Sequence, residues 1–220
     1  MLGDQGLGDE IFFLRFAAQL KARGVSIIYR CNSKIADMVA RNSFIDRLAG
    51  SDDDPGSFDG VLSAGDLPYL LGMADAREIP PSVEIPVLPD RLAEMRARLT
   101  RLGPPPYIGV TWRAGIQGLS NISKIAPLER LAAVLRPIDG TIVAVQRNPA
   151  AGEIETFAKA LGRTAHDFTA LNDDLEGMLA LVDLLDDYVC VCNTNFHLRL
   201  LRYLDTRDRQ FYSICHSCLD

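Results

Sequence analysis

Three loops of the chain carry cationic and amide side chains that could bind an anionic ligand. Each loop follows a short apolar run that is typical of a strand in a parallel sheet, and such sheets bind ligands at the carboxyl ends of their strands. We therefore expect the loops side by side at one sheet edge, beside a helix start that would suit a phosphate or pyrophosphate. The side chains concerned are Trp112 and Arg113 in the first loop, Gln146 and Arg147 in the second, Asn193, Thr194, Asn195 and His197 in the third, and Lys124 as a further cation.

Each of these residues also has a simpler interpretation. Asn193 or Thr194 could be a helix N-cap, which contributes about 1 kcal/mol to stability. His197 lies one turn into the expected helix, where a lone histidine is more often a packing residue. The cations could be solvated surface charges. Their clustering at one expected sheet edge favours ligand binding.

The N-terminal segment GDQGLGDE is a second candidate site. Gly6 and Gly8 would allow the backbone to approach a ligand closely. Asp9 would stand at the start of a helix, where the helix dipole favours a carboxylate even without a chemical role. The glycine spacing fits neither the dinucleotide-binding nor the P-loop pattern, which argues against a dehydrogenase, an epimerase or a P-loop enzyme.

Composition and charge exclude several other classes of protein. The 220 residues carry 29 acids and 23 bases, a net charge of −6 without a basic stripe, which argues against a nucleic-acid partner. The chain has no run of 18 apolar residues, so we expect no membrane span. The acids in its first ten residues lead us to expect no secretory signal. Five irregularly spaced cysteines fit a reducing cytoplasm. Cys215 and Cys218 lack a second ligand pair, so we expect no metal site.

Alternating helical and apolar segments predict an α/β fold with two Rossmann-like lobes and parallel sheets. The Gly-Pro-Pro-Pro segment at residues 103–106 predicts the joint, giving an N-terminal lobe over residues 1–103 and a C-terminal lobe over 104–220. We expect helices at residues 10–23, 34–41, 67–72, 90–102, 127–135, 153–161, 174–185 and 194–204, and strands at residues 25–31, 58–63, 107–112, 141–146, 188–192 and 211–215.

The segments QGLGDEIFFLRFA, IGVTWRAG, SKIAPLERLA, TIVAVQRNP and LNDDLEGMLALVDLLDDYVCVCNTNFHLR occur in this order. Together they resemble the heptosyltransferase-like (family 9) glycosyltransferases, especially the glycosyltransferase domain attached to bacterial tetratricopeptide-repeat proteins. The resemblance covers residues 5–202. It implies a GT-B fold, in which the C-terminal lobe binds a nucleotide-sugar donor and the N-terminal lobe binds the acceptor.

The resemblance also implies a reaction and roles for individual residues. Transfer would need no metal or other cofactor and would invert the anomeric centre, with Asp9 as the base for the acceptor hydroxyl. Gly6 and Gly8 would keep the glycine loop close to the substrates. The acceptor could be a glycan, a lipid-linked sugar or a protein. The residues implied to bind or border the donor are Trp112, Arg113, Lys124, Gln146, Asn193, Thr194, Asn195 and His197, and Arg147 is a further cation of the same expected edge.

The chain departs from its relatives at both ends. It begins almost at the glycine loop, without the preceding strand, and its last residues do not resemble the relatives' helical tail. The comparison therefore implies a GT-B-like fold with a truncated N-terminal lobe and a truncated C-terminal end. A non-catalytic nucleotide-binding module of the same fold stays open as an alternative.

Overall fold

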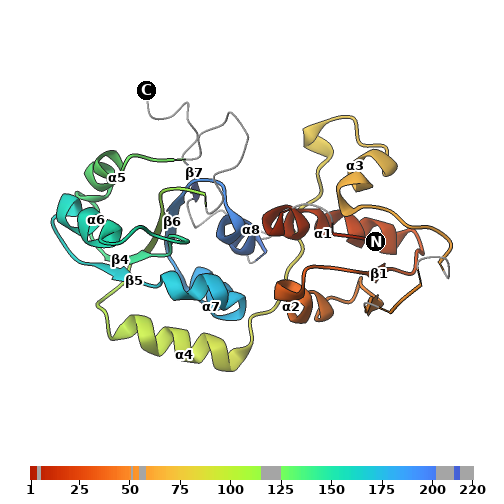
Figure 1. Ribbon diagram of the computed structural model, residues 1–220, viewed down its shortest axis with the longest axis horizontal. Helices are drawn as coiled ribbons and strands as arrows, with labels where there is room; N and C mark the ends of the chain where they lie inside the picture. Colours follow the sequence, from red (N-terminus) through yellow and green to blue (C-terminus); the bar gives the residue numbers. More distant parts are fainter. Residues whose placement is uncertain (4–5, 51, 55–57, 115–124, 202–210, 214–220) are drawn as a thin grey trace. The chain divides into compact units, whose positions relative to one another are not determined.

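The chain folds into two units of α/β structure (Figure 1). The computed structural model describes residues 1–3, 6–50, 52–54, 58–114, 125–201 and 211–213. The first unit comprises Met1–Pro86 and His197–Leu204, and the second comprises Val87–Phe196 and Asp205–Asp220. None of the helices in these described ranges is both long enough and apolar enough to cross a membrane.

The first unit is built around helix α1, Leu7–Ala22, whose buried face includes Ile11, Leu14 and Phe16. A two-stranded parallel sheet pairs β1, Ile28–Tyr29, with β2, Arg47–Leu48. Leu2 forms parallel bridges to both Arg30 and Ser63. The remaining elements are the 3-10 helices η1 Ser33–Ile35, η3 Ala64–Asp66 and η4 Ala76–Glu78, and the helices α2 Ala36–Ala40 and α3 Leu67–Leu70.

One strand expected in the first unit is wrong, and another is shorter than expected. Residues 58–62 form no strand, and Ser63 contributes only an isolated bridge, because the apolar stretch is short and Val61 is half exposed. The strand expected over residues 25–31 is reduced to β1, since β2 pairs with only two of its residues.

The second unit contains a five-stranded parallel sheet in the order β5-β4-β3-β6-β7. The order reverses between β3 and β6, which is the arrangement of a doubly wound α/β sheet. Its strands are β3 Tyr107–Thr111, β4 Thr141–Ala144, β5 Ala165–Asp167, β6 Asp187–Cys190 and β7 Phe211–Ser213. Its helices are α4 Pro89–Thr100, α5 Leu128–Leu135, α6 Glu153–Leu161, the 3-10 helix η5 Thr169–Asp173, α7 Leu175–Leu184 and α8 Thr194–Leu200, which continues into the first unit.

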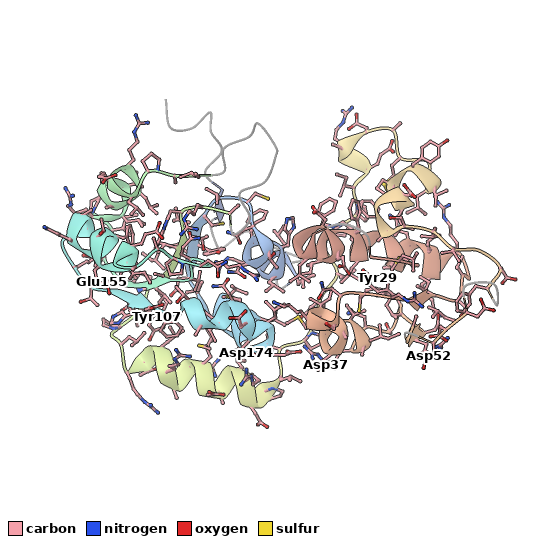
Figure 2. The ribbon with its side chains drawn as sticks, viewed as in Figure 1. Tyr29, Asp37, Asp52, Tyr107, Glu155 and Asp174 are labelled. Atoms are coloured by element: carbon pink, nitrogen blue, oxygen red, sulfur yellow. The ribbon has the colours of Figure 1, made fainter. Side chains whose placement is uncertain are left out.

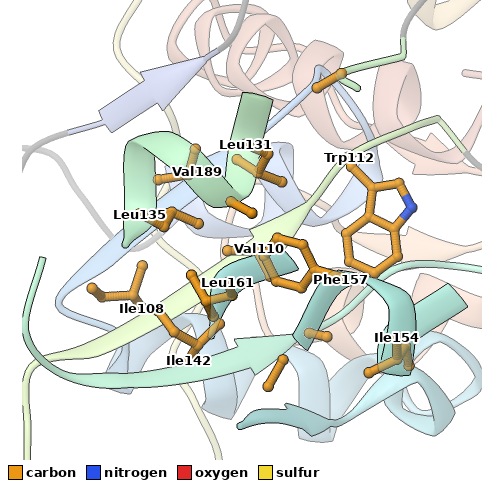
Figure 3. Close-up of a cluster of buried hydrophobic side chains, with 14 of the residues drawn as sticks. Ile108, Val110, Trp112, Leu131, Leu135, Ile142, Ile154, Phe157, Leu161 and Val189 are labelled. Carbon is orange, nitrogen blue, oxygen red and sulfur yellow. The ribbon is translucent and has the colours of Figure 1, made fainter. Parts of the chain in front are cut away.

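Helices cover both faces of this sheet (Figure 1). Side chains from alternate positions of β3 pack with α5 and α6 in one apolar cluster, which includes Val110, Leu131 and Phe157 (Figure 3). On the other face, a Cβ added to Gly109 would lie 2.4 Å from Leu185 Cδ1 and 2.8 Å from Tyr188 Cδ2. Glycine is therefore required for the sheet to approach the segment that follows α7.

The division between the units differs from the expected joint at residues 103–106. Helix α4 belongs to the second unit because it packs against α7, with Met95 and Leu99 buried. Arg91 of α4 also forms an ion pair with Asp174, which is labelled in Figure 2 and caps α7. The proline-rich segment therefore connects α4 to β3 within one unit, and the chain first passes from the first unit to the second at residues 86–87.

Candidate functional site

The carboxyl ends of β3, β4 and β6 meet at one edge of the large sheet. The ladder continues beyond the strands, since Val145 N donates to Val110 O (3.0 Å) and Val191 N donates to Thr111 O (3.2 Å). This edge includes the point between β3 and β6 where the strand order reverses, and ligands bind at such points in open α/β sheets. The three predicted loops are therefore brought together.

Gln146 joins two of these loops through its side chain. The amide is fully buried, and its Oε1 accepts hydrogen bonds from Trp112 N (3.2 Å) and Arg113 N (3.0 Å). Its Nε2 donates to Arg113 O (3.1 Å) and Arg147 O (2.8 Å). All the bonds that this side chain makes go to the backbone, so Gln146 fixes the shape of the sheet edge.

Trp112 and Arg113 are both held by Glu153 at the start of α6. Trp112 Nε1 donates to Glu153 Oε1 (2.8 Å), and the Arg113 guanidinium forms an ion pair with Glu153 Oε2 (2.7 Å). Burial raises the pKa of Glu153, but the hydrogen bonds from Arg113, Trp112 and Ala150 N more than offset this and leave the pKa below its ordinary value. Arg113 also donates to Asn148 O (2.7 Å), so it holds the following loop in place.

Arg147 differs from Arg113 in its surroundings. Its side chain is half-buried, and within the described ranges no carboxylate lies within ion-pair distance of it. Its backbone is fixed, because its carbonyl accepts bonds from Gln146 and Arg113. Lys124 lies outside the described residues, although Ile125, which follows it, forms an antiparallel bridge with Arg113. Arg147 is therefore a cation that this edge can offer to an anionic ligand.

The loop after β6 uses its amide side chains internally. Asn193 Oδ1 accepts a bond from Phe196 N (3.1 Å), which is the N-cap interaction of α8, and Asn193 Nδ2 donates to Val191 O (2.8 Å). Asn195 is buried and donates to Asn172 Oδ1 (3.2 Å). Thr194 is half-buried at the first position of α8. The asparagines therefore shape this loop.

Sequence reasoning missed several residues that support this edge. The buried hydroxyl of Tyr188 pairs with Thr111 Oγ1 (2.8 Å), and burial strongly raises the pKa of Tyr188. Asn172 donates to Val145 O (3.2 Å), which links η5 to β4. Glu153 resembles any acidic residue in a first helical turn. Nothing in the sequence distinguishes these residues from ordinary strand, loop and helix residues.

The glycine loop of the first unit leads directly into α1. Gly6 is the N-cap of α1, and its carbonyl accepts a bond from Glu10 N (3.0 Å). Gly8 lies within the first turn of the helix, and Asp9 lies beside it with an exposed side chain. A Cβ added to Gly6 would lie 3.2 Å from Asp9 Oδ2, so the carboxylate turns back toward the helix N-terminus.

Glu10, the neighbour of Asp9, anchors this loop from inside the unit. Its carboxylate is buried, and Oε2 accepts bonds from Tyr29 Oη (3.0 Å; Tyr29 is labelled in Figure 2) and Asn32 N (3.0 Å). A Cβ added to Gly3 would lie 2.3 Å from the same oxygen. Gly3 therefore lets the chain pass directly over the Glu10 carboxylate. The carboxylate of Glu10 therefore has a structural role inside the unit, whereas the carboxylate of Asp9 is exposed to solvent.

His197 belongs to the first unit, although the sequence assigned it to the C-terminal lobe. Its ring lies edge-on to Phe12 of α1, with the ring centroids 6.0 Å apart. The site residues expected in one lobe are thus divided, since Asn193, Thr194 and Asn195 belong to the second unit. In the part of the chain that the structure describes, no group of three or more His, Cys, Asp or Glu side chains could hold a metal ion.

Comparison with solved structures shows the same fold in glycosyltransferases. The chain is similar to a family 9 glycosyltransferase from Veillonella parvula, with a TM-score of 0.67 and 11% identity over 91% of this chain and 78% of that one. It is also similar to the ADP-heptose lipopolysaccharide heptosyltransferase II of E. coli, with a TM-score of 0.59 and 11% identity over 91% of this chain and 81% of that one. No protein-family model and no curated protein matches the sequence. The chain thus has the GT-B-like α/β fold of family 9 glycosyltransferase structures.

Proposed function

We propose that this protein is a glycosyltransferase that takes a sugar from a nucleotide-sugar donor. The observation that carries the proposal is the five-stranded parallel sheet, whose order reverses between β3 and β6 beside loops rich in amide and cationic side chains. Its likeness in fold to family 9 glycosyltransferases supports the same conclusion. The identities of the sugar, the nucleotide base and the acceptor are determined by the side chains that contact each of these groups.

The donor diphosphate binds at the edge of the second unit. Arg147 supplies positive charge, together with Lys124. Arg113, Trp112 and Gln146 act by positioning, because their polar groups hold the loops in which Arg147 lies. A rigid edge favours catalysis, since donors that are already in place need no reorganisation as negative charge develops on the leaving diphosphate.

Asp9 of the first unit is the proposed base. Its carboxylate takes the proton from an acceptor hydroxyl, and the resulting oxygen forms a bond to the anomeric carbon. The bond from that carbon to the diphosphate oxygen breaks with its electron pair, so the nucleoside diphosphate leaves and the configuration inverts. Asp9 is exposed in the first turn of α1, where it is accessible to a substrate.

Two finer features of the proposal have direct tests. Inversion predicts a product with the anomeric configuration opposite to that of the donor, which NMR of the product measures. Metal independence predicts that transfer continues in EDTA. A cytoplasmic location agrees with the five irregularly spaced cysteines of the sequence. The association with tetratricopeptide repeats stays a prediction.

Calorimetry with ADP, GDP and UDP tests donor binding. Arg147→Gln should weaken binding of the preferred nucleoside diphosphate roughly tenfold or more, as expected for a lost charge-assisted hydrogen bond. Arg101→Gln is the matched control, because Arg101 is an exposed arginine of the same unit that follows α4 and precedes β3, at the amino end of the sheet. Equal affinity in the parent and the Arg147 variant would contradict the proposed donor site.

A non-catalytic nucleotide-binding module is the second candidate. It is favoured by the internal use of Asn193, Asn195 and Arg113, which leaves fewer side chains for a substrate. Assays with a panel of nucleotide sugars separate the two functions. Transfer or donor hydrolysis supports the enzyme, whereas binding without either reaction supports the module.

A further inference from the structure

Arg15 of α1 is a cation that is held firmly and has no counter-ion among the residues that the structure describes. Its Nε donates to Phe12 O (2.9 Å), and its Nη1 donates to Pro80 O (3.2 Å). The guanidinium carbon lies 4.3 Å from the centroid of the Phe12 ring. These contacts fix the plane of the guanidinium group. Arg15 is therefore preorganised in the way that anion recognition requires.

No acidic side chain of the described residues forms an ion pair with Arg15. Burial lowers the pKa of its guanidinium. A partly buried charge without an opposite charge is costly, and two neutral carbonyl groups offset only part of that cost. An anion at this position would supply the missing charge.

Two of the five guanidinium N–H groups are used by the carbonyl groups of Phe12 and Pro80. Within the described part of the chain three N–H groups remain without a hydrogen bond, on Nη1 and Nη2. Arginine donors of this kind match the oxygens of a phosphate group. His197 packs against the same Phe12 ring, so a second nitrogen-bearing side chain lies close to this surface of the first unit.

We propose that Arg15, with Phe12 and His197, forms a phosphate-binding site in the first unit. The phosphate could come from a nucleoside diphosphate or from a phosphorylated acceptor, and both present the same oxygens to Arg15. The inference goes beyond the proposed function because it does not require transfer. It is also independent of Arg147, which lies in the second unit.

The alternative role for Arg15 is purely structural, since its bond to Pro80 O connects α1 to the segment that follows η4. Arg23→Gln provides a matched control for that role. Arg23 follows α1, also donates to a backbone carbonyl (Leu71 O, 3.4 Å), and its loss changes the net charge equally. A structural role predicts lower thermal stability of Arg15→Gln without any change in phosphate binding.

Binding should be measured for inorganic pyrophosphate, ADP and glucose 6-phosphate by NMR of the ¹⁵N-labelled protein. Arg15→Gln should weaken at least one of them about tenfold or more, while Arg23→Gln changes the affinities less than about twofold. Loss for pyrophosphate and ADP alone identifies a nucleoside diphosphate as the source. Loss for glucose 6-phosphate identifies a phosphorylated acceptor.

A second measurement uses the unmodified protein and so does not depend on folding of a variant. Phenylglyoxal labels arginine side chains, and mass spectrometry locates the label. A phosphate-containing probe should protect Arg15 several-fold and leave Arg23 unprotected. The proposal is overturned if no probe protects Arg15 at about 10 mM, or if the parent and Arg15→Gln bind all three probes equally.

Discussion

The buried amide of Gln146 gives a prediction whose size follows from its four hydrogen bonds. Gln146→Met keeps an unbranched side chain of similar length but removes every bond. Trp112 N and Arg113 N then lose their partner, at about 1–2 kcal/mol for each buried N–H group. The carbonyls of Arg113 and Arg147 each lose a donor, at about 0.5 kcal/mol for each bond, and the carbonyl of Arg147 keeps Arg113 Nη1. After a gain of about 1 kcal/mol from apolar burial, the expected loss of unfolding free energy is roughly 3 kcal/mol.

Urea unfolding followed by tryptophan fluorescence measures this loss directly. Trp112 is the single tryptophan of the chain and lies beside Gln146 in the second unit, so its emission reports the relevant unit. For a chain of this size, 3 kcal/mol corresponds to a melting temperature lower by about 6–12 °C.

Lys159→Met is the control, since Lys159 is an exposed, unbranched residue of α6 in the same unit and its side chain bonds no other described residue. We expect it to change stability by less than about 0.5 kcal/mol. A loss below about 1 kcal/mol in Gln146→Met would refute the reasoning, because the four bonds would then contribute almost nothing to the sheet edge.

Three further predictions concern acidity, chemistry and packing. The pKa of Glu153 in the folded protein lies below its ordinary value of 4.5, so the stabilising effect of this carboxylate is present above pH 4.5 and is lost as the pH falls through the folded-state pKa. The unfolding free energy should therefore fall less in acid for Glu153→Gln than for the parent. Asp9→Asn should lower transfer about 10²–10⁴-fold while calorimetry finds the donor affinity unchanged, and undiminished turnover would remove Asp9 as the base. Gly109→Ala should cost about 1–3 kcal/mol in urea unfolding, because its Cβ would meet Leu185 and Tyr188, whereas Gly60→Ala, in open space, serves as the control.

The sequence predicted the second unit well because its segments have strong local signals. The helix at residues 153–161 has the predicted bounds, since Gly162 takes the left-handed conformation that ends it. Strands β3, β4 and β6 coincide with apolar runs that must be buried on both faces. Strand β5 was missed, because His166 and Asp167 give a short edge strand no apolar pattern.

Only the tertiary structure decided what the side chains of the candidate site do. Sequence order placed Gln146, Asn193 and Asn195 at the carboxyl edge, but it carries no signal for whether an amide points to a ligand or to the backbone. That choice depends on partners distant in the chain, such as Trp112 N for Gln146 and Asn172 for Asn195.

The same limit applies to charge and to domain division. Arg113 and Arg147 are equivalent cations in the sequence, and only the fold gives Arg113 the carboxylate of Glu153, forty residues away. The proline-rich segment indicated a joint between lobes, but packing of α4 on α7 places that segment within one unit. Local patterns determine where helices and strands form, whereas long-range contacts determine which polar groups satisfy one another and which are left to bind a ligand.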